Sequence, residues 1–193
     1  MKFLKFLSVL LVLVCIMGTK AMSETKDSVE AKLQNASNAY SSGKFIESIE
    51  LIEEALEEIR LKTPLNIENF YPVRREADYF GAFEPRANNI YESGERLYFY
   101  LEPKNIVFVK KGETYTGGFF IDIKLKDDKG EALFEQKKFL DAEFNSRNKI
   151  HDLFANITLN LTGIPPGSYN VEFTVRDQSS DKSALVQKEI QIK

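Results

Sequence analysis

His151 is the only histidine in the 193-residue sequence and the first residue to examine for chemistry. A catalytic histidine needs a nucleophile and an orienting group, and zinc sites normally combine several His or Cys ligands. The neighbours of His151 in the sequence, Arg147, Asn148 and Asp152, form no such arrangement. We therefore predict that His151 is a surface residue that takes part in neither catalysis nor metal binding.

Two groups of carboxylates could offer oxygen ligands to calcium. One consists of Asp127, Asp128 and Glu131, and the other of Asp177 and Asp181. Neither group shows the spaced Asp/Asn ladder of a calcium-binding loop. Turn chemistry explains both, because aspartate side chains bind nearby backbone amides in turns. We predict turns at both places, and the sequence leaves open whether either one also binds calcium.

Other catalytic constellations are missing from the sequence. It contains no phosphate-binding glycine loop, serine nucleophile elbow or zinc-binding helix motif. Glycosidases use two carboxylates across a cleft, but the 29 acidic residues offer too many pairs for that criterion to select one. Gly117 and Gly118 stand in a strand context and predict a bulge or a bend. The sequence favours a protein that is not an enzyme and uses no cofactor or metal.

Residues 1–21 are typical of a secretory signal peptide. Lys2 and Lys5 precede an apolar run over residues 6–17, and Ala21 is a small residue suited to cleavage. The run is shorter than the roughly 20 residues that span a bilayer. We predict a periplasmic or secreted protein, with membrane contact only through an uncleaved N-terminal segment. The alternative is an uncleaved anchor or a lipoprotein acylated at Cys15.

Cleavage after Ala21 changes the charge and the thiol content. It removes Lys2, Lys5 and Lys20, so 26 basic residues fall to 23 against 29 acidic ones, a net charge of −6. Such a surface repels nucleic acid and anionic lipid. Cleavage also removes Cys15, the only cysteine, which excludes disulfides and cysteine-bound metals in the remaining chain. We expect a protein partner and no nucleic acid, and the sequence does not indicate an oligomeric state.

Residues 22–62 predict a helical hairpin. Asp27, with Glu30 three residues later, fits the N-cap pattern, and Gly43 separates the two helices. Each helix has an apolar stripe at helical spacing. The stripes consist of Val29, Leu33, Ala36 and Tyr40 in the first helix and of Phe45, Ile49, Ile52, Leu56 and Ile59 in the second. We expect the glutamate-rich opposite face of the second helix to be solvated.

The stretch "NAYSSGKFIESIELIEEALEEI", residues 38–59, resembles a tetratricopeptide repeat, a helical hairpin of about 34 residues. Gly43 and Phe45 match the turn of the repeat, whereas Lys32 and the displaced Pro64 depart from its pattern. The alternative is a helical hairpin without repeat ancestry. No second repeat follows, and a single hairpin cannot bury its own apolar face. We therefore expect something else to cover that face.

The pattern changes after the hairpin. Residues 63–94 are irregular but rich in aromatic rings, which predicts a connector over residues 63–77 packed on the next domain, with "YFGAF" as a first strand. Beyond Arg96, apolar and polar residues alternate as in strands. Strands are predicted at "RLYFYLE", "NIVFVKK", "GGFFIDIKLK", "EALFEQKKF", "NITLNLT", "YNVEFTVR" and "ALVQKEIQI".

No helical pattern interrupts these strands, so we predict an antiparallel two-sheet sandwich over residues 78–193. The region resembles the immunoglobulin-like modules of secreted bacterial proteins, through "IYESGERLYFYLEP", "DDKGEALFEQ" and "LTGIPPGSYNVEFTVRD". Gly167 and the two prolines before it stop the chain and set the register in which Val171 and Phe173 point inward. The predicted fold class is α+β, an N-terminal helical hairpin followed by an immunoglobulin-like β-sandwich.

The predicted function is that of an exported, non-enzymatic interaction or structural module of the cell envelope. Tyr98 and Tyr100 are the candidate partner-binding residues, because they give the strand "RLYFYLE" a second apolar face. The other interpretation is that the helices and the connector cover both rings. The alternative function is a secreted carbohydrate-binding or hydrolytic accessory domain. That function would place several tyrosine rings coplanar on an open sheet face, and the absence of tryptophan argues against it.

Overall fold

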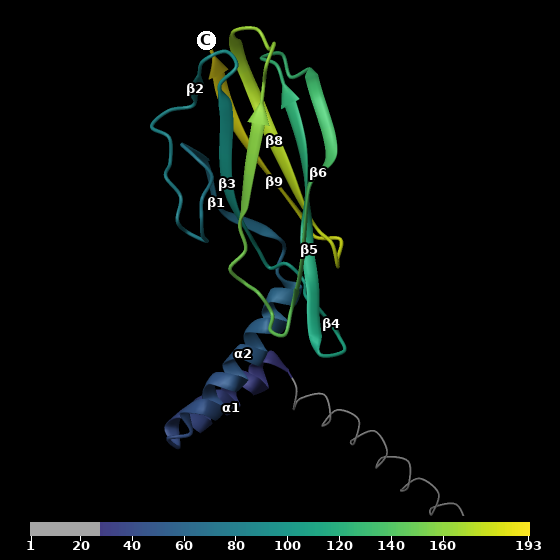
Figure 1. Ribbon diagram of the computed structural model, residues 1–193. Coiled ribbons are helices and arrows are strands. Elements are labelled where there is room, and N and C mark those ends of the chain that lie inside the picture. The colour runs from purple at the N-terminus through teal and green to yellow at the C-terminus, as the bar shows by residue number, and fades with distance from the viewer. Residues whose placement is uncertain (1–27) are drawn as a thin grey trace, which may run out of the picture. The chain divides into compact units, whose positions relative to one another are not determined.

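The computed structural model describes residues 28–193 and places them in two compact units (Figure 1). The first unit ends at Lys62 and is helical, and the second, Thr63–Lys193, is built from strands. The chain is therefore of the α+β class. The predicted signal peptide lies outside the described residues. Neither helix among the described residues is long and apolar enough to cross a membrane.

The helical unit is a hairpin of α1 (Val29–Ser41) and α2 (Phe45–Lys62). Asp27 lies outside the described residues, and the N-cap of α1 is Ser28, whose Oγ accepts a hydrogen bond from the Ala31 amide (3.2 Å). The expectation that Asp27 caps the helix is therefore wrong by one residue. The chain reverses at Gly43, which has a φ of 75° that residues with a Cβ rarely adopt.

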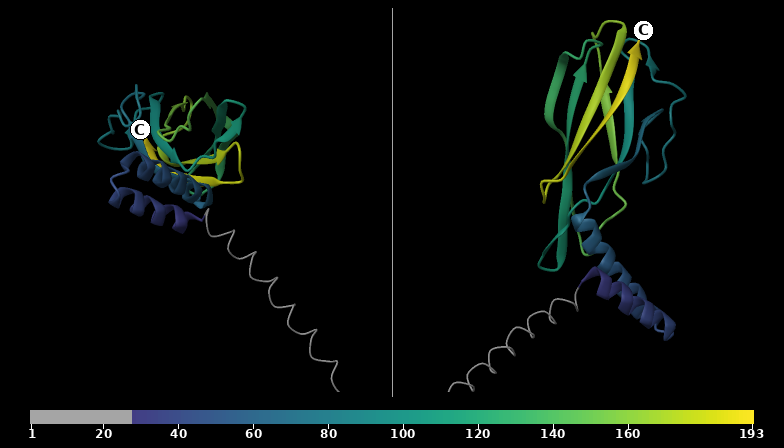
Figure 2. Two further views of the ribbon diagram at one scale, coloured as in Figure 1. Left: turned by 90° about the horizontal axis from the view of Figure 1, so that it is seen from below. Right: turned by 180° about the vertical axis from the view of Figure 1, so that it is seen from behind.

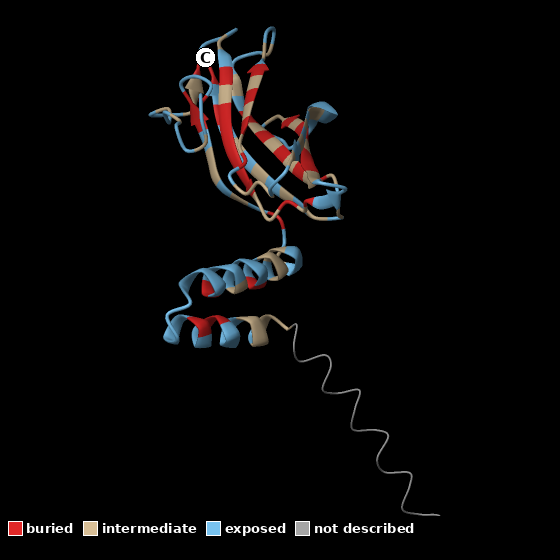
Figure 3. Ribbon diagram, turned by 60° about the horizontal axis from the view of Figure 1, so that its bottom comes forward, coloured by how far each residue is buried: buried red, intermediate tan, exposed pale blue. Residues whose placement is uncertain are grey.

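Small residues form the contact between the two helices. Ala36 and Ala39 of α1 and Ser48 and Ala55 of α2 are the buried residues of the hairpin. The Ser48 hydroxyl donates a hydrogen bond to the Ala36 carbonyl oxygen (2.9 Å), so the backbones approach closely there. Figure 3 shows that the buried positions of both helices are confined to the sides that face each other. The large apolar side chains of the hairpin lie outside this contact.

A three-stranded antiparallel sheet begins the second unit. Its strands are β1 (Asn66–Val73), β3 (Arg96–Lys104) and β7 (Ala155–Asn160), with β3 in the centre. β1 occupies part of the predicted connector, so that segment is not irregular. "YFGAF" forms a turn rather than a strand, with the Ala82 amide bonded to the Tyr79 carbonyl (3.1 Å). The first strand of the unit was therefore predicted in the wrong place.

The other strands form a six-stranded sheet in the order β2-β9-β8-β5-β4, with β6 paired to β5. Their bounds are Ile90–Tyr91 for β2, Val109–Lys111 for β4, Thr114–Lys126 for β5, Ala132–Ser146 for β6, Gly167–Asp177 for β8 and Ser183–Ile192 for β9. All pairs are antiparallel except the short parallel pair of β2 with β9. Of the predicted strand "NIVFVKK", only the end became β4. β6 pairs with β5 alone among the described strands and forms an edge of the sheet.

Both sheets contribute to one apolar core. Phe99 of β3, Ile157 of β7 and Phe173 of β8 are almost completely buried, and the rings of Phe99 and Phe173 lie 5.2 Å apart. Along β8, inward and outward positions alternate as predicted, with Val171 and Val175 inward. Seen from below, the strands curl round this core as a half-barrel with an open side (Figure 2, left).

Gly117 and Gly118 have a different role from the one predicted. The pairing of β5 with β6 runs through both residues without a register shift, so neither is a bulge. A Cβ on Gly118 would meet the Ala142 carbonyl oxygen at 2.0 Å, and one on Gly117 would meet the Val107 carbonyl oxygen at 2.7 Å. The two glycines therefore permit close approach of neighbouring backbone. The bulge lies further along, opposite Asp122.

Candidate functional site

Tyr100, a candidate partner-binding residue, lies in the centre of an aromatic stack. Its ring stacks on Phe83 at a centroid distance of 4.3 Å and on Phe154 at 5.6 Å, and Phe83 stacks on Tyr71 at 5.2 Å. Tyr100 is fully buried, and Tyr98 is half-buried in the same cluster. Of the two interpretations of these tyrosines, the burial of Tyr100 supports the one in which its ring is covered. The cover comes from Phe154 and from the segment between β1 and β2.

Polar contacts hold this covering segment in place. The Tyr100 hydroxyl donates a hydrogen bond to Glu102 (2.6 Å) and accepts one from the Gly81 amide (2.7 Å). Asn156 bonds both the amide and the carbonyl group of Ala77 (2.9 Å each). Burial, together with the hydrogen bond to Glu102, raises the pKa of the Tyr100 hydroxyl to about 12. This hydroxyl therefore stays protonated at neutral pH and acts as a structural bridge.

The stacked rings also bear on the carbohydrate alternative. A sugar platform needs aromatic faces that are open to the ligand. Here both faces of Tyr100 and of Phe83 are occupied by other rings of the stack. The rings lie one on another rather than coplanar on an open sheet face. The geometry expected for a carbohydrate platform is not the geometry of this cluster.

The first carboxylate group occupies a turn, as predicted, whereas Asp177 is the last residue of β8 and Asp181 lies in the bend that follows. Asp127 Oδ1 accepts hydrogen bonds from the amides of Lys129 (3.0 Å) and Glu131 (2.8 Å). The buried Asp177 accepts from the amides of Val107 (2.7 Å) and Ser179 (2.6 Å). Residues 28–193 contain no group of three or more His, Cys, Asp or Glu side chains arranged to hold a metal ion. His151 is half-buried in the segment that precedes β7.

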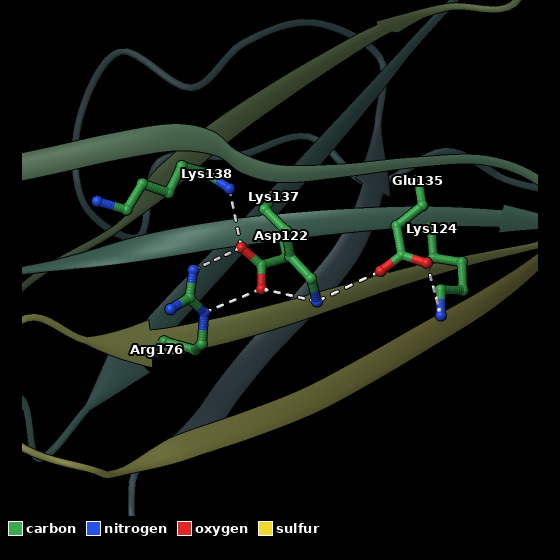
Figure 4. A network of polar contacts seen from close by, with 6 residues as sticks. All are labelled: Asp122, Lys124, Glu135, Lys137, Lys138 and Arg176. Atoms are coloured by element: carbon green, nitrogen blue, oxygen red, sulfur yellow. Dashed lines mark hydrogen bonds and ion pairs between the residues drawn. The ribbon is translucent and has the colours of Figure 1, made fainter.

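Asp122 is the centre of a charged network on the outer face of the larger sheet (Figure 4). Its carboxylate accepts two hydrogen bonds from Arg176 (2.8 and 2.9 Å) and one from the Lys138 amide (2.9 Å). Lys137 Nζ lies 3.4 Å from the same carboxylate and 3.3 Å from Glu135. Each Asp122 oxygen therefore has two partners within the protein.

The network fixes the bulge in β6. Between the pairs of β5 with β6 on either side of Asp122, β6 has three residues where β5 has one, and Lys138 adopts a φ of 49°. Burial by itself raises the pKa of the Asp122 carboxyl, but the hydrogen bonds from Arg176 and from the Lys138 amide hold that pKa below its usual value. Because its acceptor sites are filled, Asp122 is explained as a structural anchor rather than as a catalytic acid.

An open pocket of about 660 Å³ lies where the turn after β5 meets β8 and β9. Lys126 and Lys188 line it together with Asp127, Glu172 and Glu189. Lys126 and Glu172 already form an ion pair at 2.6 Å. The pocket therefore mixes both signs of charge.

Most of the large apolar side chains that are exposed to solvent among residues 28–193 belong to the hairpin. All five residues of the α2 stripe are exposed: Ile59 by 43%, and the four that are considered below, Phe45 by 58%, Ile49 by 55%, Ile52 by 47% and Leu56 by 40%. From α1, Leu33 and Tyr40 are exposed as well, and the Tyr40 and Phe45 rings make an edge contact at 5.5 Å. The term hairpin face is used below for these six residues, without Ile59. Exposed apolar surface gathered in this way marks interaction sites.

Acidic side chains border the hairpin face along α2. With 3.6 residues per turn, Glu50 and Glu53 fall in the row next to the stripe, on the side of α2 remote from α1. Glu54 and Glu58 bind Lys32, and Glu57 binds Arg60 at 2.8 Å. Glu50 and Glu53 form no ion pair within residues 28–193, so they leave negative charge beside the apolar stripe.

Sequence reasoning identified the apolar stripe but named other residues as the candidates for partner binding. The stripe was expected to be covered, and the tyrosines of β3 were the binding candidates. The signal that could have pointed to the hairpin was the size of its crossing residues. Ala36, Ser48 and Ala55 bring the helices together and leave the larger side chains outside the contact.

Comparisons with known proteins give little further information. No protein-family model matches the sequence, and no curated protein matches it. Solved structures with limited similarity include the alkylpurine DNA glycosylase AlkC from Pseudomonas fluorescens bound to DNA containing an abasic site analog, with 10% identity and a TM-score of 0.38. The alignment covers 83% of this chain and 40% of that one.

Two further structures have similar scores. The sporulation control protein Spo0M from Bacillus subtilis has 10% identity and a TM-score of 0.39, over 68% of this chain and 50% of that one. A family 123 glycoside hydrolase from Clostridium perfringens has 10% identity and a TM-score of 0.36, over 67% of this chain and 27% of that one. This chain thus spans half or less of each of the three proteins, and TM-scores this low carry no argument about function.

Proposed function

We propose that this chain is an exported, non-enzymatic protein-interaction module of the cell envelope, and that it docks its partner on the hairpin face. The single observation that carries the proposal is the exposure of Phe45, Ile49, Ile52 and Leu56 along one side of α2. Complete burial of a fully exposed side chain of this kind contributes about 1.5–3 kcal/mol, and each of these half-exposed side chains can contribute a part of that amount. A partner seated on this face therefore gains binding free energy from several neighbouring residues.

The proposal gives the second unit the role of a stable carrier, an immunoglobulin-like sandwich. The strand order supports that assignment: β3 and β7 take the places of strands B and E, and β5, β8 and β9 take those of C, F and G. In the same scheme, β1 corresponds to A, and β6 to the C′ strand of variable-type domains. The tetratricopeptide likeness of the hairpin is supported by its turn at Gly43 and its small crossing residues.

Export is supported by the basic start and the apolar run of residues 1–21. The absence of catalysis is supported by the roles of the polar residues described above. The carboxylate of Asp122 binds the amide of Lys138 in the bulge, and the hydroxyl of Tyr100 binds the amide of Gly81 in the covering segment. Both groups therefore have structural roles. The carbohydrate alternative has less support, because the faces of Tyr100 are occupied.

Site-specific photo-crosslinking in cells that produce the full chain tests the proposal. A photoreactive residue at Ile52 is expected to capture a partner protein, and the Ile49→Asp substitution in the same chain is expected to abolish the capture. Asn35, an exposed position away from the hairpin face, is the control and should capture nothing specific. Equal capture at Ile52 and Asn35, or capture that survives Ile49→Asp, would contradict the proposal.

A further inference from the structure

We infer that the occupant of the hairpin face is an amphipathic α-helix of a partner protein, with Lys or Arg residues beside its apolar stripe. The inference rests on the proposed function, because it specifies the chemistry of the partner at the same surface. Three observations lead to it: the shape of the face, the charge along its border and the charge of the whole hairpin.

The shape of the face suits a helix. From Phe45 to Leu56, the apolar side chains recur every three or four residues over three turns, which at 1.5 Å per residue extends about 17 Å. A second helix of similar length can place its own apolar ridge along this row and beside Tyr40 of α1, since helices pack ridge into groove. The hairpin has no open strand edge that could pair with an extended peptide. An extended segment would have to leave its backbone groups unpaired over the apolar side chains.

The border selects the charge of the partner. Glu50 and Glu53 lie next to the stripe and are not neutralised within residues 28–193, whereas the neighbouring Glu57 is paired with Arg60. A helix seated on the stripe would bring its flanking residues beside these two carboxylates. Basic flanking residues gain favourable interactions there, and acidic ones are repelled.

The same charge argues against a second copy of this chain as the occupant. Residues 28–62 contain seven glutamates against four basic residues, a net charge of −3. Two hairpin faces brought together would place both acidic borders and both net negative charges in one interface. Like charges at an interface cost binding energy and serve to exclude wrong partners.

The test uses the full chain without residues 1–21 and two labelled helical peptides of the same leucine-striped sequence. One peptide carries Lys at its flanking positions, and the other carries Glu. We expect the Lys peptide to bind at least about tenfold tighter than the Glu peptide at low ionic strength, with the difference reduced by salt. The Glu50→Lys/Glu53→Lys variant should reverse this preference.

Two controls separate charge from docking. Glu113→Lys/Glu131→Lys makes the same change in net charge at exposed positions of the second unit and should leave the preference for the Lys peptide in place. Ile49→Asp should remove the binding of both peptides. Far-UV circular dichroism of each variant shows that the helices are retained.

The outcomes distinguish this inference from the proposed function. If both peptides bind equally well and Ile49→Asp still abolishes binding, the docking surface stands and the charge of the partner is wrong. If Ile49→Asp has no effect on either peptide, the docking surface itself is wrong. Sedimentation that shows a dimer of the full chain, broken by Ile49→Asp, would overturn the inference in favour of a second copy.

Discussion

Each unit of this protein has an apolar surface outside its central core, and the two surfaces are treated differently. In the strand-rich unit, the rings on the outer face of β3 are covered by the chain itself. The Tyr100 hydroxyl accepts a hydrogen bond from the Gly81 amide and Asn156 donates one to the Ala77 carbonyl, and these bonds hold the cover in place. On the hairpin, Ile49 and Ile52 stay about half exposed. The difference indicates that an apolar strand face alone does not predict a binding site. What matters is whether another segment of the chain makes polar contacts that hold that segment over the apolar face.

The largest expected effect concerns the core that both sheets share. Phe173→Asp places a charge between Phe70 and Phe99, where burial without a partner costs several kcal/mol. Because domains are stable by only about 5–15 kcal/mol, we expect the strand-rich unit to unfold. Circular dichroism should show loss of the β-sheet signal. Thr174→Ala on the outward side of the same strand should change the free energy of unfolding by less than about 0.5 kcal/mol, and equal damage from both changes would refute the one-sided strand.

The covered surface is tested by Tyr100→Ser. Removing this buried ring should lower the free energy of unfolding by about 3–5 kcal/mol, as large-to-small changes at buried aromatic residues do. Thermal melts measure the effect. The matched control is Tyr79→Ser, because Tyr79 is 74% exposed in the same segment and its loss should be nearly neutral. A neutral Tyr100→Ser would mean that the covering segment is not packed on β3.

Asp122→Asn tests the charged network and has a defined pH dependence. Loss of the charge-assisted hydrogen bonds should destabilise the protein by about 1.5–3 kcal/mol at neutral pH. Because the folded-state pKa of Asp122 is lowered, the carboxylate stabilises the fold fully above its unfolded pKa of about 4, and this contribution is lost as the pH falls through the lower folded value. The difference in stability between wild type and variant should therefore shrink only in acid. The exposed Asp128→Asn is the control, and a difference that stays constant down to strong acid would contradict the assignment.

The smallest expected effect on stability belongs to the hairpin face. Ile52→Ser removes a large side chain that is 47% exposed, so we expect a change in melting within about 0.5 kcal/mol. The matched change at the helix contact is Ala55→Ser, because Ala55 is fully buried and a larger polar side chain there disturbs the packing. A strongly destabilised Ile52→Ser would mean that the hairpin face already contributes to the fold and is not available to a partner.

Sequence patterns predicted the elements with clear periodicity. Both helices, the β5–β6 hairpin and the alternation along β8 follow from residue spacing alone. β1 was missed because Pro72 and the surrounding rings hide the alternation of a strand. The structure explains why a proline is tolerated in this strand: β1 lies at the edge of its sheet, where a residue without an amide hydrogen is allowed.

The candidate site was less predictable than the fold. The sequence shows that both faces of β3 are apolar, but it does not show that another segment covers the outer face. Asn156 holds that segment through hydrogen bonds to Ala77, which lies 79 positions away in the chain. Local spacing contains no trace of such a contact. The helical spacing of its residues predicted the apolar stripe of α2. The stripe stays exposed to solvent because the small residues Ser48 and Ala55, rather than the stripe, form the contact with α1.

The bulge in β6 has a consequence for how the protein behaves in a crowded compartment. β6 is long and lies at an edge of its sheet, so a regular strand there would act as a template on which further molecules could add and grow into filaments. Lys137 and Lys138 interrupt that template near its middle, and Asp122 keeps the interruption in place. A neighbouring strand can match the edge only on one side of the interruption. We expect this single carboxylate, by holding the interruption in place, to disfavour strand pairing between one molecule and the next.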